Sequence, residues 1–255
     1  MTPFHYELRA TWPGRSESAT VVADKFIRMV RRLEAIDPLF TNWILLAEDQ
    51  EAELKLDEVA ANVDAWVEAN VAMDEGEPFP EQGFRLYAAS NHGPGGYDLS
   101  RTPSISVTAG SEFSNKVELD IGNMAVAADL AAIDGATFEK VLLAIVSVWD
   151  CTWGSVRLSN QLDLNPRFSP GPVPSSYSKT GPWRLGYGMS WMAYLSEPRA
   201  QGLVVPYEIE TERLADGGMF LNASGEQMDP DNPQHAAVSM LLSDILEQRA
   251  GDPIR

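Results

Sequence analysis

The twelve residues FEKVLLAIVSVW, from Phe138 to Trp149, decide the fold class of this chain. Apolar side chains recur along the stretch at intervals of three and four residues, which predicts a helix, and almost no polar face remains. We expect Thr137 to cap this helix, because a threonine hydroxyl can accept a hydrogen bond from a free backbone N–H of the first turn. A helix with so little polar surface belongs at the centre of the fold.

Three strands are predicted before this helix, at residues 84–90, 104–109 and 116–122. A glycine-rich turn at residues 91–97 separates the first two, and the pattern is typical of an antiparallel meander. Residues 3–12 predict a further strand with one buried face, because apolar and polar residues alternate there.

Helices are expected before and after the meander in the chain. One runs from Ser18 to Asp37, a second opens at Asp57 and a third opens at Pro233, each with apolar residues at helical spacing. Residues 42–47 are dense in apolar side chains, as in a central strand. Other ordered segments are predicted at residues 188–195, 203–207 and 218–223. The predicted class is therefore α+β, with a mostly antiparallel sheet packed against about four helices.

The length of the chain allows one large core. With 255 residues, of which 44% are apolar, we expect a single α+β domain over residues 1–255. The alternative is two packed lobes, joined at residues 162–183. That stretch holds five prolines in twenty-two residues and predicts a long irregular loop.

Charge and cysteine content restrict the partners and the compartment. The net charge of −18 disfavours binding to nucleic acid or to anionic membranes and favours a basic partner. Cys151 is the only cysteine, which excludes an internal disulfide and a thiolate metal cluster. The N-terminal residues lack a signal-peptide core, and no stretch reaches the roughly eighteen apolar residues of a membrane span. We expect a cytoplasmic protein.

No constellation of catalytic residues emerges from the sequence. His5, His92 and His235 have no common spacing, and Cys151 is expected to be a buried packing residue. The segment around Ser190 resembles a nucleophile elbow only in part, because Met192 stands where that turn needs a second glycine. We expect no enzyme, no cofactor and no metal, although an active site assembled from distant positions stays open.

Acidic residues are concentrated in one part of the chain. Between residues 48 and 81 there are twelve acids and one base, Lys55, and no lysine or arginine occurs from residue 56 to 84. Asp64 and Glu68 stand four residues apart, where like charges destabilise a helix by about 0.2 to 0.5 kcal/mol. On a helical wheel they point away from Val63 and Val67, so they face solvent.

Two interpretations of these acids remain open. One is an ordinary solvated helix face; the other is a docking surface for a basic protein, which explains why repulsive carboxylates are kept together. We predict the docking surface. The predicted partner-binding residues are Glu48, Asp49, Glu51, Glu53, Asp57, Glu58, Asp64, Glu68, Asp74, Glu75 and Glu77.

Three short motifs in the second half of the chain suggest a family. They are Trp153-Gly154, the block SWMAYLS at residues 190–196, and residues 229–235 leading into the last helix. With these motifs the chain resembles the immunity protein 52 family of bacterial polymorphic-toxin systems. The resemblance implies a cytosolic antidote that binds and neutralises a cognate toxin domain, commonly a nuclease of restriction-endonuclease-like type. It implies no binding motif within residues 48–81, so the interface there is inferred from charge alone.

The leading hypothesis is thus a toxin-neutralising protein with a basic partner. The alternatives are a hydrolase with a dispersed active site and an acidic adaptor for another basic protein. Trp153, Trp191 and Tyr194 are expected to be core residues, because each lies among apolar neighbours. The proline-rich loop at residues 162–183 could also contact the toxin.

Overall fold

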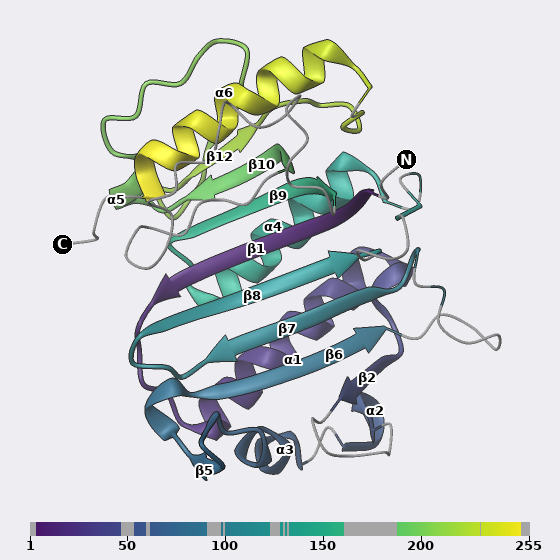
Figure 1. Ribbon diagram of the computed structural model, residues 1–255, viewed down its shortest axis with the longest axis vertical. Helices are drawn as coiled ribbons and strands as arrows, with labels where there is room; N and C mark the ends of the chain where they lie inside the picture. Colours follow the sequence, from purple (N-terminus) through teal and green to yellow (C-terminus); the bar gives the residue numbers. More distant parts are fainter. Residues whose placement is uncertain are drawn as a thin grey trace.

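A ten-stranded antiparallel sheet runs through the molecule (Figure 1). The computed structural model describes residues 4–46, 54–59, 62–90, 98, 100–122, 128–129, 131, 133–160, 188–229 and 231–250. Its strands are β1 (Phe4–Pro13), β2 (Trp43–Leu46), β3 (Leu54–Lys55), β6 (Phe84–Ser90), β7 (Pro103–Ala109), β8 (Ser114–Ile121), β9 (Trp153–Asn160), β10 (Gly188–Leu195), β11 (Glu210–Arg213) and β12 (Met219–Asn222). They are ordered β11-β12-β10-β9-β1-β8-β7-β6-β2-β3. A small hairpin pairs β4 (Met73–Asp74) with β5 (Glu77–Pro78).

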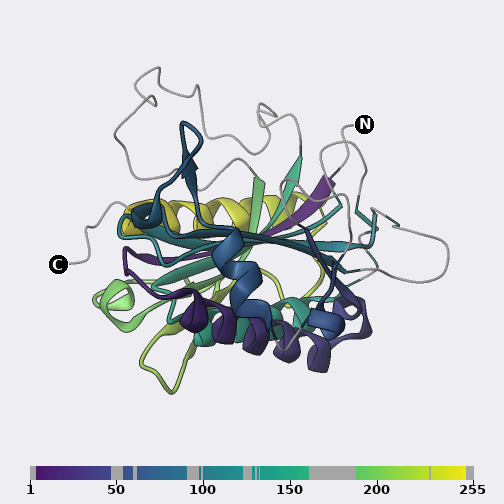
Figure 2. The same cartoon turned by 90° about the horizontal axis from the view of Figure 1, so that it is seen from below.

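Helices cover the two faces of this sheet unequally (Figure 2). The helices α1 (Ala19–Ile36), α3 (Val63–Ala69) and α4 (Gly135–Trp149) lie on one face, and α6 (Pro233–Ala250) lies on the other, against β10. Short helical segments complete the fold at α2 (Leu56–Val59), α5 (Glu197–Ala200), η1 (Pro38–Phe40) and η3 (Pro80–Gln82). The predicted α+β class and the antiparallel meander of β6, β7 and β8 are confirmed.

The apolar helix α4 lies in the core, as its sequence predicts. It packs on the inward-facing side chains of β1, where alternate residues are buried. The ring of Tyr6 lies 4.7 Å from that of Phe138, and Trp12 stacks on Trp149 at 5.1 Å. Such aromatic pairs add about 0.5 to 1.5 kcal/mol to the burial of their surface, so both ends of α4 are held against the central strand.

The Trp153-Gly154 motif has a packing role. A Cβ atom on Gly154 would stand 2.9 Å from Cδ1 of Leu142, so only glycine lets α4 approach β9 this closely. Trp153, Trp191 and Tyr194 are buried, which confirms them as core residues.

Several local predictions are wrong. The cap of α4 is Asp134, whose side chain accepts a hydrogen bond from the N–H of Thr137. Thr137 lies inside the helix, since the chain turns helical three residues earlier than predicted. The strand at residues 42–47 is not central, because among the described strands only the two-residue β3 lies beyond β2 at that edge.

The helix that opens near Asp57 is two short helices, α2 and α3, whereas the sequence predicts one. Residues 203–207 are not a strand, and β9 and β11 are strands that the sequence pattern does not predict. The turn at residues 91–97 and the proline-rich loop at residues 162–183 lie outside the described residues. No helix in the described part of the chain is long and apolar enough to cross a membrane.

Candidate partner-binding surface

The predicted acidic residues are only partly within the described structure. Glu48, Asp49, Glu51 and Glu53 lie outside it, and for Glu58 only the backbone, in α2, is described. The others belong to three elements: Asp57 lies in α2, Asp64 and Glu68 in α3, and Asp74, Glu75 and Glu77 in the β4–β5 hairpin.

The helix α3 separates charge from core as the helical wheel predicts. Asp64 and Glu68 are exposed, while Val63, Trp66 and Val67 are buried. The ring of Trp66 packs 5.4 Å from that of Phe26, which holds α3 against α1. Neither carboxylate has an ion-pair partner among the described residues. The acidic side of α3 is therefore available to a partner.

Asp57 differs from this pattern. Its Oδ1 lies 2.7 Å from Nη2 of Arg31, a residue of α1 that the spacing of the acidic segment gives no reason to expect. This hydrogen bond, with a second one to Glu34, raises the pKa of Arg31. Asp57 thus ties α2 to α1 and is not one of the unpartnered charges.

The β4–β5 hairpin presents three further acids. Asp74, Glu75 and Glu77 are all exposed, and the turn places Glu75 and Gly76 in the left-handed region, at φ 48° and 89°. A tight two-residue hairpin turn requires such angles at both central positions, which is why glycine follows Glu75. The base of the hairpin is fixed beside the start of β6, because the N–H of Ala72 donates to the carbonyl of Gly83 at 2.8 Å.

The exposed acids form two separate arms: Asp64 and Glu68 on α3, and Asp74, Glu75 and Glu77 on the β4–β5 hairpin. Figure 1 shows α2, α3 and β5 at the same end of the sheet. Figure 2 shows that the hairpin rises on the side opposite to α1 and α3. The negative charge therefore flanks one end of the sheet on both sides instead of forming one flat patch.

A second polar cluster lies at the centre of the sheet, on the face opposite α4. Glu7 stands directly across from Asp120 on β8 and from Arg157 on β9, and it forms an ion pair with Arg157. Burial, followed by the charges of Glu7 and Glu118, raises the pKa of Asp120 to about 7. Of this cluster only His5 is a candidate from the sequence, since cross-strand register cannot be read from one strand.

The chemistry open to this central cluster is limited. Ligand atoms of His5, Glu7 and Asp120 lie within 4.8 Å of one another, which is close enough for a metal ion. The guanidinium of Arg157 already neutralises Glu7, and its positive charge opposes a cation at the same place. Burial lowers the pKa of His5, which favours its neutral form. On the strength of the Glu7–Arg157 ion pair we interpret the cluster as a half-buried polar network of the sheet.

The other catalytic candidates occupy structural positions. Ser190 lies within strand β10, and its Oγ is 2.9 Å from that of Ser243 on α6. Cys151 is buried, and burial raises the pKa of its thiol. Nδ1 of His235 accepts a hydrogen bond from the N–H of Asp229 before α6. His92 lies outside the described residues.

Comparison with known proteins gives the family. The model of the immunity protein 52 family matches residues 5–252. The chain belongs to the immunity protein 52 family. Membership implies a cognate toxin as partner.

Solved structures support the fold. Pseudomonas aeruginosa T6SS protein PA0821 is similar with a TM-score of 0.54 at 12% identity, over 98% of this chain and 78% of that protein. A taurocyamine kinase from Schistosoma mansoni aligns over 98% of this chain and 33% of the kinase at 13% identity. Its TM-score of 0.25 is too low to indicate a shared fold. No relative is found among curated protein sequences.

Proposed function

We propose that this immunity protein neutralises its cognate toxin by binding a basic nuclease domain of that toxin through its two acidic arms. The first arm is Asp64 and Glu68 on α3; the second is Asp74, Glu75 and Glu77 on the β4–β5 hairpin. The observation that carries the proposal is that all five carboxylates are exposed and have no ion-pair partner among the described residues. Family membership supplies the class of partner.

Electrostatics supports a nuclease as the target. A nuclease binds a polyanion and must present a positive surface to phosphates, so clustered carboxylates can occupy that surface in competition with nucleic acid. Attraction between opposite charges can raise association rates to on the order of 10⁸ M⁻¹s⁻¹ at low salt. Such inhibition needs no catalysis by the immunity protein, and a nuclease target places the encounter in the cytoplasm.

Charge reversal in each arm tests the proposal. The variants are Asp64→Lys with Glu68→Lys, and Asp74→Lys with Glu75→Lys and Glu77→Lys; Asp57 is left unchanged because it pairs with Arg31. The probe is the toxin encoded beside the immunity gene. We expect each variant to associate about tenfold or more slowly at 50 mM NaCl, with a flatter salt dependence, because steering depends on opposite charges.

The matched control is Glu210→Lys with Glu212→Lys on β11. These acids are exposed and lie at the opposite edge of the sheet, and the double change alters the net charge as much as the α3 variant does. Its association rate should stay within about twofold of the wild type, because the changed charges lie far from the arms. Wild-type rates in both arm variants would overturn the acidic interface, and a toxin that co-expression leaves fully toxic would overturn the immunity role.

A further inference from the structure

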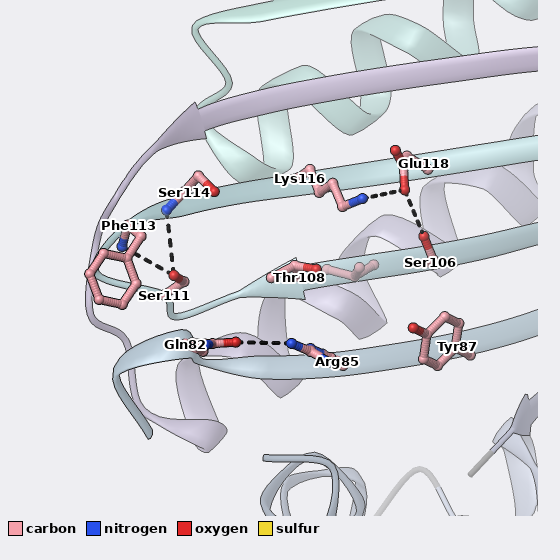
Figure 3. Close-up of a pocket in the computed structure, with 11 residues that line it drawn as sticks. Gln82, Arg85, Tyr87, Ser106, Thr108, Ser111, Phe113, Ser114, Lys116 and Glu118 are labelled. Carbon is pink, nitrogen blue, oxygen red and sulfur yellow. Dashed lines mark hydrogen bonds and ion pairs between the residues drawn. The ribbon is translucent and has the colours of Figure 1, made fainter. Parts of the chain in front are cut away.

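An open pocket of about 500 Å³ lies on the sheet face opposite α1 and α4, over β6, β7 and β8 (Figure 3). Strand register explains its lining. Arg85, Thr108 and Lys116 stand directly across from one another on the three strands, and so do Tyr87, Ser106 and Glu118 in the next outward-facing row. Because outward-facing residues alternate with buried ones along each strand, both rows project from this face.

Hydrogen-bond donors and positive charge are in excess in this pocket. Arg85 donates to Oε1 of Gln82 at 2.9 Å and has no carboxylate partner among the described residues. Nζ of Lys116 lies 2.7 Å from Glu118, and Nε of Arg9 lies 3.4 Å from the same carboxylate. The pocket lining therefore holds two cations, Arg85 and Lys116, and one acid, Glu118, which Arg9 on β1 also contacts, although the whole chain carries a net charge of −18.

Glu118 stays ionised in this setting. Burial acts to raise its pKa, but the hydrogen bond from Lys116 and the charge of Arg9 outweigh burial and lower it. Glu118 is thus saturated by the two cations, and the guanidinium of Arg85 remains the cationic group without an acid. Guanidinium forks bind carboxylates through two parallel hydrogen bonds.

Two exposed aromatic rings flank the cations. Phe113, at the turn between β7 and β8, is 66% exposed, and Tyr87 on β6 is 41% exposed (Figure 3). Exposed aromatic residues beside an arginine are the composition that dominates binding energy at protein interfaces. The pocket is also close to the acidic hairpin in the chain, since Gln82 of its lining ends η3, which begins two residues after the last residue of β5.

We propose that this pocket binds an acidic side chain of the toxin, an aspartate or glutamate on a protruding segment. Its carboxylate lies on the Arg85 guanidinium, and apolar atoms beside it pack on Phe113 and Tyr87. This inference rests on the proposed function and adds a contact of opposite sign to it. A nuclease that holds a divalent metal carries carboxylates within its basic groove, so one toxin surface can fit both the acidic hairpin and this cationic pocket.

The test is the affinity of the Arg85→Glu variant for the toxin encoded beside the immunity gene. Long-range attraction alone predicts tighter binding, because the variant makes the immunity protein more negative towards a basic partner. A seated carboxylate predicts the opposite: Kd should rise about 10- to 100-fold, because two carboxylates would then face each other. Arg28→Glu, on α1 at the other face of the sheet, is the matched control and should change Kd less than about twofold.

Two further measurements keep the test decisive. Phe113→Ser, at an exposed position, should weaken binding about fivefold or more at unchanged melting temperature, since interface aromatics are common binding anchors. A toxin Asp→Lys or Glu→Lys variant should restore binding to Arg85→Glu. If wild-type protein binds the toxin while Arg85→Glu binds as tightly or more tightly, the pocket inference is wrong and the proposed function stands. If the wild type does not bind the toxin, the proposed function itself fails.

Discussion

Asp120 shows how a single residue is changed by its neighbours across the sheet. Its pKa of about 7 in the folded protein lies well above the usual value of about 4 for aspartate in an unfolded chain. Between these two values the folded state binds more protons than the unfolded state. Stability must therefore fall as the pH rises from about 4 to 7, with the loss complete above pH 7.

We predict that Asp120→Asn removes this pH dependence. The amide stays neutral, so the variant should be more stable than the wild type at pH 8 by on the order of 1 to 3 kcal/mol and nearly equal to it at pH 4. Urea unfolding at the two pH values measures the difference. Asp64→Asn, at an exposed site, is the control and should leave the slope unchanged. Equal slopes in wild type and Asp120→Asn would contradict the assignment.

At the scale of elements, local signals set some boundaries and packing set others. Ser18 and Asp37 cap the two ends of α1, where the sequence predicts its limits. A cap can be predicted because it acts on the adjacent turn: the Ser18 side chain accepts a hydrogen bond from the N–H of Val21. No glycine or proline marks the break between α2 and α3. The strand β9 has alternating residues, with Val156 and Leu158 against Ser155 and Arg157, but its polar side is buried too, so it resembles neither a surface strand nor an apolar one.

The cap of α4 gives a prediction at this scale. Asp134→Ala should destabilise the protein by about 1 kcal/mol, because the N–H of Thr137 loses its acceptor. Thr137→Ala should cost less than Asp134→Ala, since alanine loses only the side-chain hydrogen bond to Asp134, keeps the backbone N–H and favours the helix. Chemical denaturation of the two variants side by side measures the order. A larger loss in Thr137→Ala would return the cap to the position that the sequence predicts.

At the scale of the whole molecule, the net charge of −18 acts against the folded state. Salt screens such repulsion, because the Debye length falls from about 30 Å at 0.01 M to about 3 Å at 1 M ionic strength. We expect the melting temperature to rise by several degrees between 20 and 500 mM NaCl. The rise should be smaller in the Asp64→Lys, Glu68→Lys variant than in the Glu210→Lys, Glu212→Lys variant, although their net charges are equal.

Differential scanning calorimetry of the free proteins measures this effect without a toxin. Equal salt dependence in the two variants would show that the acids of α3 repel their surroundings no more than acids elsewhere. Repulsion among the α3 acids would then cost no extra stability. That would remove the reason to prefer a docking surface over an ordinary solvated face. A melting temperature that does not respond to salt in the wild type would contradict the argument from net charge as well.

The sequence by itself determined the α+β class, the meander, the long helices and the outward direction of Asp64 and Glu68. These follow from periodicity and capping, which act between residues a few positions apart. Tertiary structure alone decided that Arg31 pairs with Asp57, that Glu7 meets Arg157 from 150 residues away, and that Arg85 and Lys116 share a pocket. The physical reason is strand order and register: an antiparallel sheet places residues side by side according to pairing, and a single strand holds no record of its partner.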